Sequence, residues 1–239
     1  MRLDKIIQQQ CSLSKKDIKK SFKNGLVTVN DKIVSEPSFS AEGLIHDVKY
    51  QGQSLNVPKH QYWQLNKPQN CVTANIDEDM TIFDLLPAHL SEDSFSIGRL
   101  DKNTTGLILV TNNGPLGYYL MQKKFSIWKK YYVELKEPLL DEFIELFQFG
   151  IIFADGKQCL PAKLVIVDKH RCFLTIQEGS RHQVKKMFLA VGRYVTKLHR
   201  VQIGPLKLDT SLKIGEYRQL TKMEVKALYF DYERGVIHD

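Results

Sequence analysis

The sequence predicts an α+β protein in which a small basic module precedes a larger domain with a mostly antiparallel or mixed sheet. Strand-like segments outnumber helical ones, and many of them form hairpin-like pairs joined by short turns. The first 30 residues hold seven Lys or Arg against two Asp or Glu, which sets this part of the chain apart. We therefore expect a module at residues 1–57 and a second domain at residues 58–239.

Composition is typical of a folded globular protein that meets a polyanion. Hydrophobic residues make up 43% of the 239 positions, charged residues make up 26%, and the formal net charge is +7. The four cysteines lie far apart without metal-ligand spacing, so we interpret them as reduced thiols. The N-terminal residues lack the apolar core of a signal peptide, and no apolar run is long enough to span a bilayer. We expect a soluble, cytoplasmic protein without a membrane partner.

The first predicted element is a basic helix. Ser14 is a suitable N-cap with Asp17 three residues later, Ile18 and Phe22 form an apolar stripe, and Gly25 ends the helix. Its remaining surface is a group of lysines: Lys15, Lys16, Lys19, Lys20 and Lys23. They are either a solvated face or a phosphate-binding face. Mutual repulsion of five like charges favours the second, because the phosphates of a nucleic acid would offset it.

Short strands are expected to complete the module. Residues 26–29 and 32–34 flank an Asn30-Asp31 turn, and residues 54–60, with Pro58, are interpreted as the linker to the second domain. Residues 1–52 resemble the small module found in a small-subunit ribosomal protein, in tyrosyl-tRNA synthetases and in several RNA-modifying enzymes. That resemblance implies binding of structured RNA, with Arg2 and the five helix lysines as contacts.

The second domain alternates strands with short helices. A strand at 62–67 ends before Pro68, and an unbroken apolar strand is expected at 107–110. The remaining elements are a short helix at 81–86 stopped by Pro87, a helix opened by Pro115, a strand at 129–135, an amphipathic helix closed by Gly150, a hairpin around 167–172, and a helix with a core-facing stripe at 184–191 ended by Gly192.

Two charged segments are candidates for function. Arg99 and Asp101 bracket one leucine in a turn that leads into the apolar strand, which fits either a structural ion pair or a site held rigid. Residues 178–200 hold six Lys or Arg against one acid, and the entry to the helix at 184 also presents backbone N–H groups suited to anions. His182 and His199, taken on their own, fit a role as polar neighbours of a packed helix as well as they fit a functional role.

Several chemistries have no sequence support. The chain lacks a P-loop, a dinucleotide fingerprint, an HExxH motif and a nucleophile elbow. Clustered acids for a metal-dependent nuclease are also missing. One carboxylate, Asp101, framed by cationic segments, remains as the candidate reactive group.

The segment "GRLDKNTTGLILVTNNG" resembles the signature of pseudouridine synthases of the RsuA type, with the aspartate at Asp101. "LNKPQNCV", "KKYYVEL" and "EGSRHQVKKMFLAVGRYVTKLHRVQIGPL" resemble the other motifs of that family, in the same order along the chain. "HQVKKM" is nearer the small-subunit type than the large-subunit type. Asn113 and Trp128 depart from the common pattern at positions outside the catalytic core.

The resemblance implies isomerisation of a uridine to pseudouridine in ribosomal RNA, most simply the small-subunit 16S rRNA, without cofactor or metal. Asp101 would be the essential carboxylate, as nucleophile or as base, with Lys185 as its cation, Tyr131 stacking on a flipped-out uracil and Arg99 beside the RNA. Further RNA contacts are expected in the second domain: Lys67, Lys129, Arg181, His182, Gln183, Lys186 and Arg200.

Alternatives remain open at the level of sequence. A large-subunit rRNA enzyme of the same family, or a ribosome-assembly factor that binds RNA without catalysis, would share the charge and the N-terminal module. The expected partner is ribosomal RNA or a small-subunit assembly particle, and the expected state is a monomer. The sequence does not identify the modified uridine.

Overall fold

A computed structural model describes residues 1–122 and 125–237 of the chain. The chain divides into two compact units. The first comprises Met1–Gln61 and Thr221–Lys226, and the second comprises Tyr62–Leu220 and Ala227–Asp239. No helix in the described part of the chain is long and apolar enough to cross a membrane.

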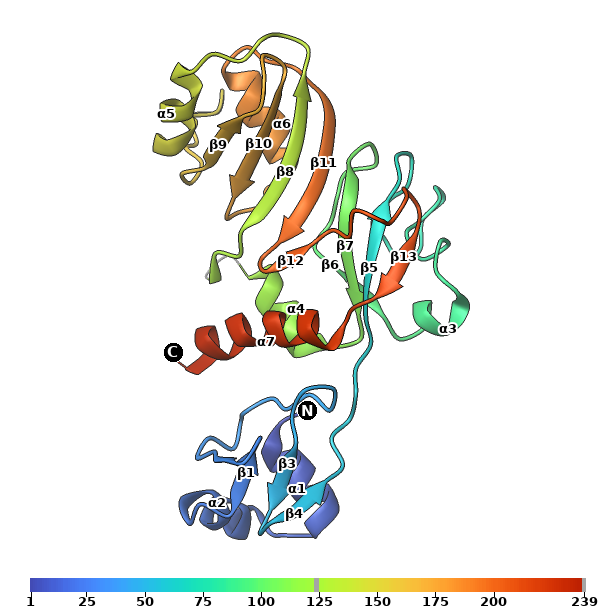
Figure 1. The fold of residues 1–239 in the computed structure, drawn as a ribbon, viewed down its shortest axis with the longest axis vertical. Coiled ribbons are helices and arrows are strands. Elements are labelled where there is room, and N and C mark those ends of the chain that lie inside the picture. Colours follow the sequence, from blue (N-terminus) through green and yellow to red (C-terminus); the bar gives the residue numbers. More distant parts are fainter. Residues whose placement is uncertain (123–124, 238–239) are drawn as a thin grey trace. The chain divides into compact units, whose positions relative to one another are not determined.

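The first unit packs two helices on a small antiparallel sheet. Helices α1 (Leu3–Cys11) and α2 (Lys15–Lys23) accompany strands β1 (Val27–Val29), β2 (Lys32–Ile33), β3 (Val48–Tyr50) and β4 (Gln53–Leu55), in the sheet order β2-β1-β3-β4 (Figure 1). The side chain of Ser14 caps α2 by accepting from the backbone N–H of Asp17, as predicted. Ile18 and Phe22 are buried in the core of this unit.

The small sheet differs from the expected hairpin in one respect. Gln53–Leu55, part of which was interpreted as linker, forms β4 and pairs with β3. Gln51 and Gly52 turn the chain with positive φ values of 49° and 79°. Val57 beyond β4 is still buried in the core of the unit. The segment is polar and very short, so it carries no strand pattern that the sequence could reveal.

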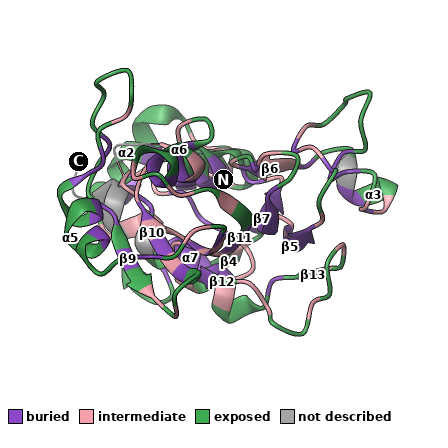
Figure 2. Cartoon of the chain, turned by 90° about the horizontal axis from the view of Figure 1, so that it is seen from above, coloured by how far each residue is buried: buried purple, intermediate pink, exposed green. Residues whose placement is uncertain are grey.

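The second unit is built on a mixed sheet. Nine of the described strands form it: β5 (Tyr62–Lys67), β6 (Phe95–Ile97), β7 (Thr105–Thr111), β8 (Lys129–Leu135), β9 (Lys163–Ile166), β10 (Arg171–Ile176), β11 (Val195–Ile203), β12 (Leu206–Lys207) and β13 (Tyr217–Gln219). The main order is β13-β5-β7-β11-β8-β10-β9, with β6 beside β7 and β12 beside β11 (Figure 1). All of β7 is buried, and Figure 2 shows β5 and β7 as buried strands.

Strand β11 joins the two parts of this sheet, pairing in parallel with β7 and antiparallel with β8. Its contact with β7 is very close at Gly106, where an added Cβ would lie 2.3 Å from the backbone oxygen of Arg200. Gly106 also has a φ of +104°, which disfavours any other residue. Glycine is therefore required where the two strands meet.

The second unit also contains the helices α3 (Ala88–Ser91), α4 (Gly114–Met121), α5 (Glu142–Phe149) and α6 (Gln183–Ala190). Helix α7 (Lys222–Ile237) begins in the residues of the first unit and continues in those of the second. Phe147 of α5 and Phe188 of α6 lie 5.0 Å apart between ring centroids, within the core that also includes residues of β8, β9 and β10. The strands at 62–67, 107–110 and 129–135, the helices at Pro115 and Gly150, and the hairpin around 167–172 form as predicted.

The predicted helix at 81–86 is wrong. Thr81–Leu86 forms turns, and the short helix α3 begins only after Pro87. Asp84 accepts hydrogen bonds from the backbone N–H and the hydroxyl of Thr81, and the Thr81 hydroxyl also accepts from the backbone N–H of Phe83. These side-chain contacts compete with helical hydrogen bonds and hold the segment in turns.

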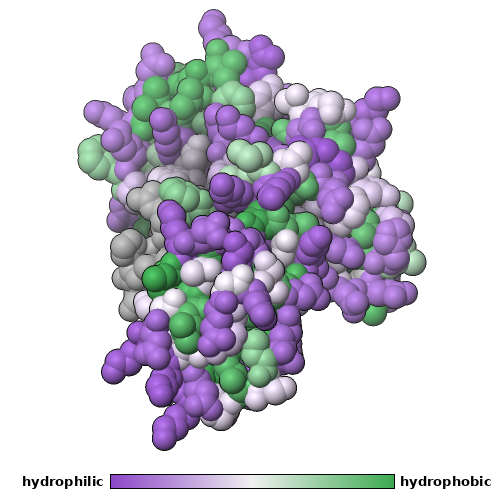
Figure 3. Space-filling model, turned by 60° about the horizontal axis from the view of Figure 1, so that its bottom comes forward, coloured by the Kyte–Doolittle hydropathy of each residue, from purple (hydrophilic) through white to green (hydrophobic). Residues whose placement is uncertain are grey.

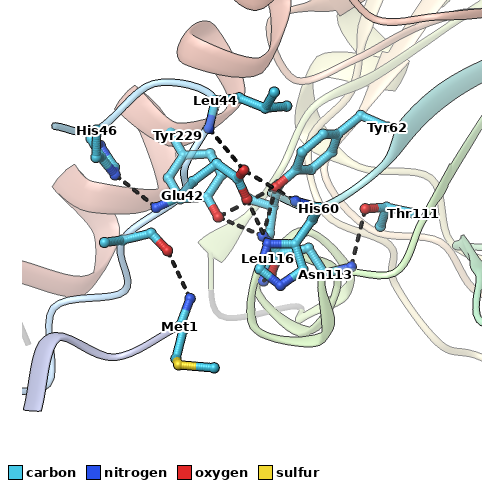
Figure 4. A network of polar contacts seen from close by, with 11 residues as sticks. Met1, Glu42, Leu44, His46, His60, Tyr62, Thr111, Asn113, Leu116 and Tyr229 are labelled. Carbon is cyan, nitrogen blue, oxygen red and sulfur yellow. Dashed lines mark hydrogen bonds and ion pairs between the residues drawn. The ribbon is translucent and has the colours of Figure 1, made fainter. Parts of the chain in front are cut away.

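Two networks of buried polar groups, one in each unit, are shown in Figure 4. In the first unit the fully buried carboxylate of Glu42 lies 2.6 Å from Nδ1 of His60 and accepts from the backbone N–H of Leu44. In the second unit Asn113 caps α4 and donates from Nδ2 to the hydroxyls of Tyr62 and Tyr229. Asn113, one of the two residues that depart from the family pattern, therefore serves as the N-cap of α4.

Candidate active site

The turn between β6 and β7 is fixed through its backbone. Gly98 has a φ of +72°, and the chain then runs through Arg99 and Leu100 to Asp101. The hydroxyl of Thr73 accepts from the backbone N–H of Leu100 at 3.1 Å and donates to its carbonyl at 3.0 Å. The backbone N–H of Thr104 donates to the carbonyl of Asp101 at 2.9 Å. Asp101 therefore lies in a rigid turn that leads into β7.

A buried lysine reinforces the same turn. Nζ of Lys67 lies within hydrogen-bond distance of four backbone carbonyls, those of Pro68, Asp101, Lys102 and Thr104, at 2.9 to 3.2 Å. The residue is fully buried, and burial lowers the pKa of its ammonium to about 8. The prediction that Lys67 binds RNA is wrong, because the side chain is enclosed by the turn that carries Asp101.

The carboxylate of Asp101 faces the start of α6. Its Oδ2 lies 3.6 Å from Nζ of Lys185, and its Oδ1 lies 3.5 Å from Nε2 of His182. Its side chain is 29% exposed, so solvent still reaches the carboxylate. Of the two interpretations of the charged turn, the Arg99–Asp101 ion pair does not form among the described residues. Asp101 is paired with another element instead.

His182 reaches Asp101 because of its backbone conformation. It precedes α6 with a φ of 57° and a ψ of 24°, in the left-handed region that few residues other than glycine adopt. The sequence assigned His182 only to RNA binding. His182 and Lys185 are three residues apart at a helix start, a spacing that indicates that both side chains can face the same group. The left-handed backbone of His182 has no signal in the sequence.

The loop before α6 is held by Gln183. Its Oε1 accepts from the backbone N–H of Ser180 at 2.9 Å, and its Nε2 donates to Glu178 at 2.7 Å. The side chain is 3% exposed. Gln183 therefore shapes the loop that presents His182 and Lys185 and also lines the cavity beside Asp101, so its RNA contact stays a prediction.

Tyr131 closes the site from β8. It is 7% exposed and lines a cavity of about 60 Å³ together with Asp101, Thr104 and Val184. Its strand lies beside β11, where Arg200 is its direct cross-strand partner. The three residues expected to form the reactive centre, Asp101, Lys185 and Tyr131, are thus brought together from the turn before β7, from α6 and from β8.

Two larger cavities flank this centre. One of about 600 Å³ is lined by Thr73, Arg99, Asp101, Arg181 and His182. The other, of about 300 Å³, is lined in part by Arg99, Lys129, Tyr131 and Arg200. Arg99 borders both cavities and is exposed, which suits contact with an extended ligand.

The other predicted RNA contacts lie on the surface. The five lysines of α2 are exposed, and so are Arg181 and Lys186. Arg2 is exposed and forms an ion pair with Asp4 at 2.8 Å. Hydrophilic side chains predominate on the face shown in Figure 3. Within residues 1–122 and 125–237, no three His, Cys, Asp or Glu residues gather in a way that could hold a metal ion.

The chain is similar in sequence to a family of known proteins. Residues 61–190 match the family model described as RNA pseudouridylate synthase. The chain is 39% identical over 233 residues to the ribosomal small subunit pseudouridine synthase A of Haemophilus influenzae, covering 95% of this chain and 99% of the relative. It is 38% identical to the protein of that name from Escherichia coli K12, covering 95% and 100%.

A solved structure extends the likeness to three dimensions. A crystal structure described as a pseudouridylate synthase superposes with a TM-score of 0.69 and is 36% identical, covering 95% of this chain and 99% of the other. The likeness therefore spans both units of the chain.

Proposed function

Because this chain belongs to the RNA pseudouridylate synthase family, we propose that it converts one uridine of small-subunit ribosomal RNA into pseudouridine. The observation that carries the proposal is the placement of Asp101 on a rigid turn, with Lys185 and His182 opposite its carboxylate and Tyr131 in the same cavity. The small-subunit target rests on the names of the two relatives, and on the sequence from His182 to Met187.

The target nucleotide has to leave its stack to reach Asp101. Tyr131 offers an apolar ring at the edge of the cavity, and a uracil flipped out of the RNA would stack on it. Asp101 would then lie beside the sugar of the same nucleotide. The larger cavity lined by Arg99, Arg181 and His182 provides cations for the RNA on one side of the flipped base.

The reaction breaks the bond between N1 of uracil and C1′ of ribose and forms a bond between C5 and C1′. The base rotates between the two steps; the proton on C5 is lost and N1 gains one, so the reaction needs no external oxidant or reductant. Asp101 acts in its ionised form, either as nucleophile at C1′ or as base, and both roles remain compatible with its position. The ammonium of Lys185 balances the charge of the carboxylate, and Nε2 of His182 lies 3.5 Å from its Oδ1.

The N-terminal module is proposed to hold the RNA. The five exposed lysines of α2 present a cationic surface, and residues 1–57 would act as the RNA-binding part beside a catalytic domain at 58–239. The protein would act as a monomer on ribosomal RNA or on a small-subunit assembly particle. Such a substrate implies a cytoplasmic location.

The first experiment is a map of pseudouridine in ribosomal RNA from cells with and without the gene. We expect one small-subunit site to disappear and to return with the wild type but not with Asp101→Asn, which keeps shape and removes charge. Asp79→Asn is the matched control, since Asp79 forms an exposed ion pair with Lys102, the neighbour of Asp101 in the chain.

Other outcomes would redirect the proposal. A lost site in large-subunit RNA would keep the reaction and correct the target. If no site were lost anywhere, the non-catalytic assembly factor would take its place. A normal rate in Asp101→Asn would remove the catalytic role from Asp101.

A further inference from the structure

A second cationic cavity lies beside the proposed base site. It has a volume of about 300 Å³ and is reached from the Tyr131 side of the reactive centre. The turn at Gly98 and Arg99, the strand residues Lys129 and Tyr131, and Arg200 of β11 contribute to its wall. Asp101 does not line this cavity, so the cations in the cavity wall are not neutralised by its carboxylate.

Arg200 brings an unsatisfied charge to the cavity. The residue is 2% exposed, and its Nε donates to the backbone carbonyl of Leu107 at 2.8 Å. Its Nη2 is buried and has no hydrogen-bond partner among the residues that the structure describes. Nη1 lies 4.0 Å from the Cβ position of Gly98, whose missing side chain leaves room there. A buried guanidinium with a free donor favours an anion as its partner.

Lys129 adds a second cation on the same side of the sheet. It lies two residues before Tyr131 on β8, so both side chains point to the same face, and Arg200 is opposite Tyr131. Nζ of Lys129 donates to the carbonyl of Ile127 at 3.0 Å and retains two protons for other acceptors. Burial, and to a lesser extent the charge of Arg200, lower the pKa of Lys129 to about 8.

The acid in the cavity wall is already engaged. Oε1 of Glu178 accepts from the backbone N–H of Leu160 at 2.8 Å and from Nε2 of Gln183 at 2.7 Å. The groups with charge that face Lys129 across the cavity are therefore Arg99, Arg200 and this hydrogen-bonded carboxylate. Cations outnumber the acid, and an additional anion would relieve their repulsion.

We propose that Lys129 and Arg200 form a binding subsite for one backbone phosphate of the RNA, next to the flipped uridine. Phosphate oxygens accept hydrogen bonds from a guanidinium and an ammonium together. The subsite fixes the RNA strand beside Tyr131 while the base reacts. This inference rests on the proposed function, because it assumes that RNA is the substrate.

The test measures binding, so that it does not depend on turnover. Asp101→Asn protein is titrated with a small-subunit rRNA fragment containing the mapped uridine, and each phosphate flanking that uridine is replaced in turn by an uncharged methylphosphonate. Lys129→Gln and Lys129→Arg are compared with Lys130→Gln in the same background. Lys130 is the matched control, since it neighbours Lys129 on β8 but its Nζ lies over the ring of Phe173.

One methylphosphonate is expected to weaken binding about tenfold, as is Lys129→Gln, which corresponds to the loss of a charge-assisted hydrogen bond. Combined, they should weaken binding about tenfold rather than a hundredfold, because both remove the same interaction. Lys129→Arg should retain most of the affinity, and Lys130→Gln should leave every RNA unaffected. Equal thermal midpoints of the variants show that folding is intact.

Two results would overturn the subsite. In the first, the loss of affinity caused by Lys129→Gln multiplies with the loss caused by each methylphosphonate, which would mean that Lys129 contacts none of these phosphates. Alternatively, Lys130→Gln could weaken binding as much as Lys129→Gln, which would reduce the effect to general charge. Wild-type turnover on the same fragment is measured in parallel, so a failure of the proposed function is seen as absent pseudouridine whatever the binding data.

Discussion

Replacing Lys67 by Met should lower both the stability and the activity of the second unit. Met keeps most of the buried aliphatic chain, and it removes the ammonium that donates to the carbonyls of Pro68, Asp101, Lys102 and Thr104. Nζ has three protons, and a net hydrogen bond from a charged group contributes about 1.5–3 kcal/mol. The cost of keeping a charge buried opposes this gain, so we expect a net loss of about 3 kcal/mol.

For a domain of this size, about 3 kcal/mol corresponds to a fall in Tm of roughly 6–12 °C. Calorimetry of the purified protein measures this shift. Turnover should fall by about a hundredfold, the penalty for misplacing a reactive group by about 1 Å. Lys102→Met is the control, because Lys102 pairs with Asp79 at the surface and should change stability by less than about 1 kcal/mol.

Equal thermal midpoints for Lys67→Met and Lys102→Met would refute the reasoning. That result would mean that the turn holds its shape without the ammonium. A lowered Tm with normal turnover would confirm the stabilising contacts but reject the link between Lys67 and the position of Asp101.

Three further predictions concern separate parts of the molecule. Tyr131→Leu should lower kcat/KM at least about tenfold because the base no longer stacks, whereas Tyr131→Phe should stay within about threefold; equal effects would reject stacking. Changing Lys16, Lys19 and Lys20 together to Gln should reduce the salt dependence of RNA binding, by about 0.7–0.9 in slope for each phosphate that is no longer neutralised, and an unchanged slope would make α2 a solvated face. Hydrogen bonds from Ser211 and then Arg218 lower the pKa of Asp209 to about 2 from 3.8 in the unfolded chain, so its contribution to stability is full above 3.8 and is lost as pH falls towards 2. Acid unfolding between these values should therefore be less steep in Asp209→Asn.

Local pattern predicted much of the fold. The apolar run before Asn112 became the buried strand β7, and Ser14 capped α2 as its spacing indicated. The family motifs identified Asp101, Tyr131 and Lys185. In the fold, Asp101 shares a cavity with Tyr131 and an ion pair with Lys185. These features depend on neighbours in sequence or on whole motifs, so a single chain was sufficient to find them.

Features that depend on tertiary context were not predictable. A lysine before a proline gives no sign of being buried, and Lys67 was assigned to RNA although four backbone carbonyls enclose it. The hydrogen bonds of Gln183 to Ser180 and Glu178, which hold the loop before α6, likewise gave no signal in the local sequence. The contact between His182 and Asp101 required a left-handed residue that the local sequence does not specify. The parallel pairing of β7 with β11 joins residues that lie far apart along the chain, such as Thr105 and His199, beyond the reach of any local pattern.

The central position of β11 has a consequence for how the enzyme is made. Until Val195–Ile203 has left the ribosome, β5 and β7 can pair with each other, and β8, β10 and β9 can form a separate antiparallel sheet in that order, but no strand joins the two. Asp101 belongs to the first fragment and Tyr131 to the second. Contacts between such distant residues form late in folding, because a long loop must close before they are made. A nascent chain that already carries every proposed catalytic residue therefore still lacks the strand that joins the two halves of the sheet and brings Asp101 and Tyr131 together.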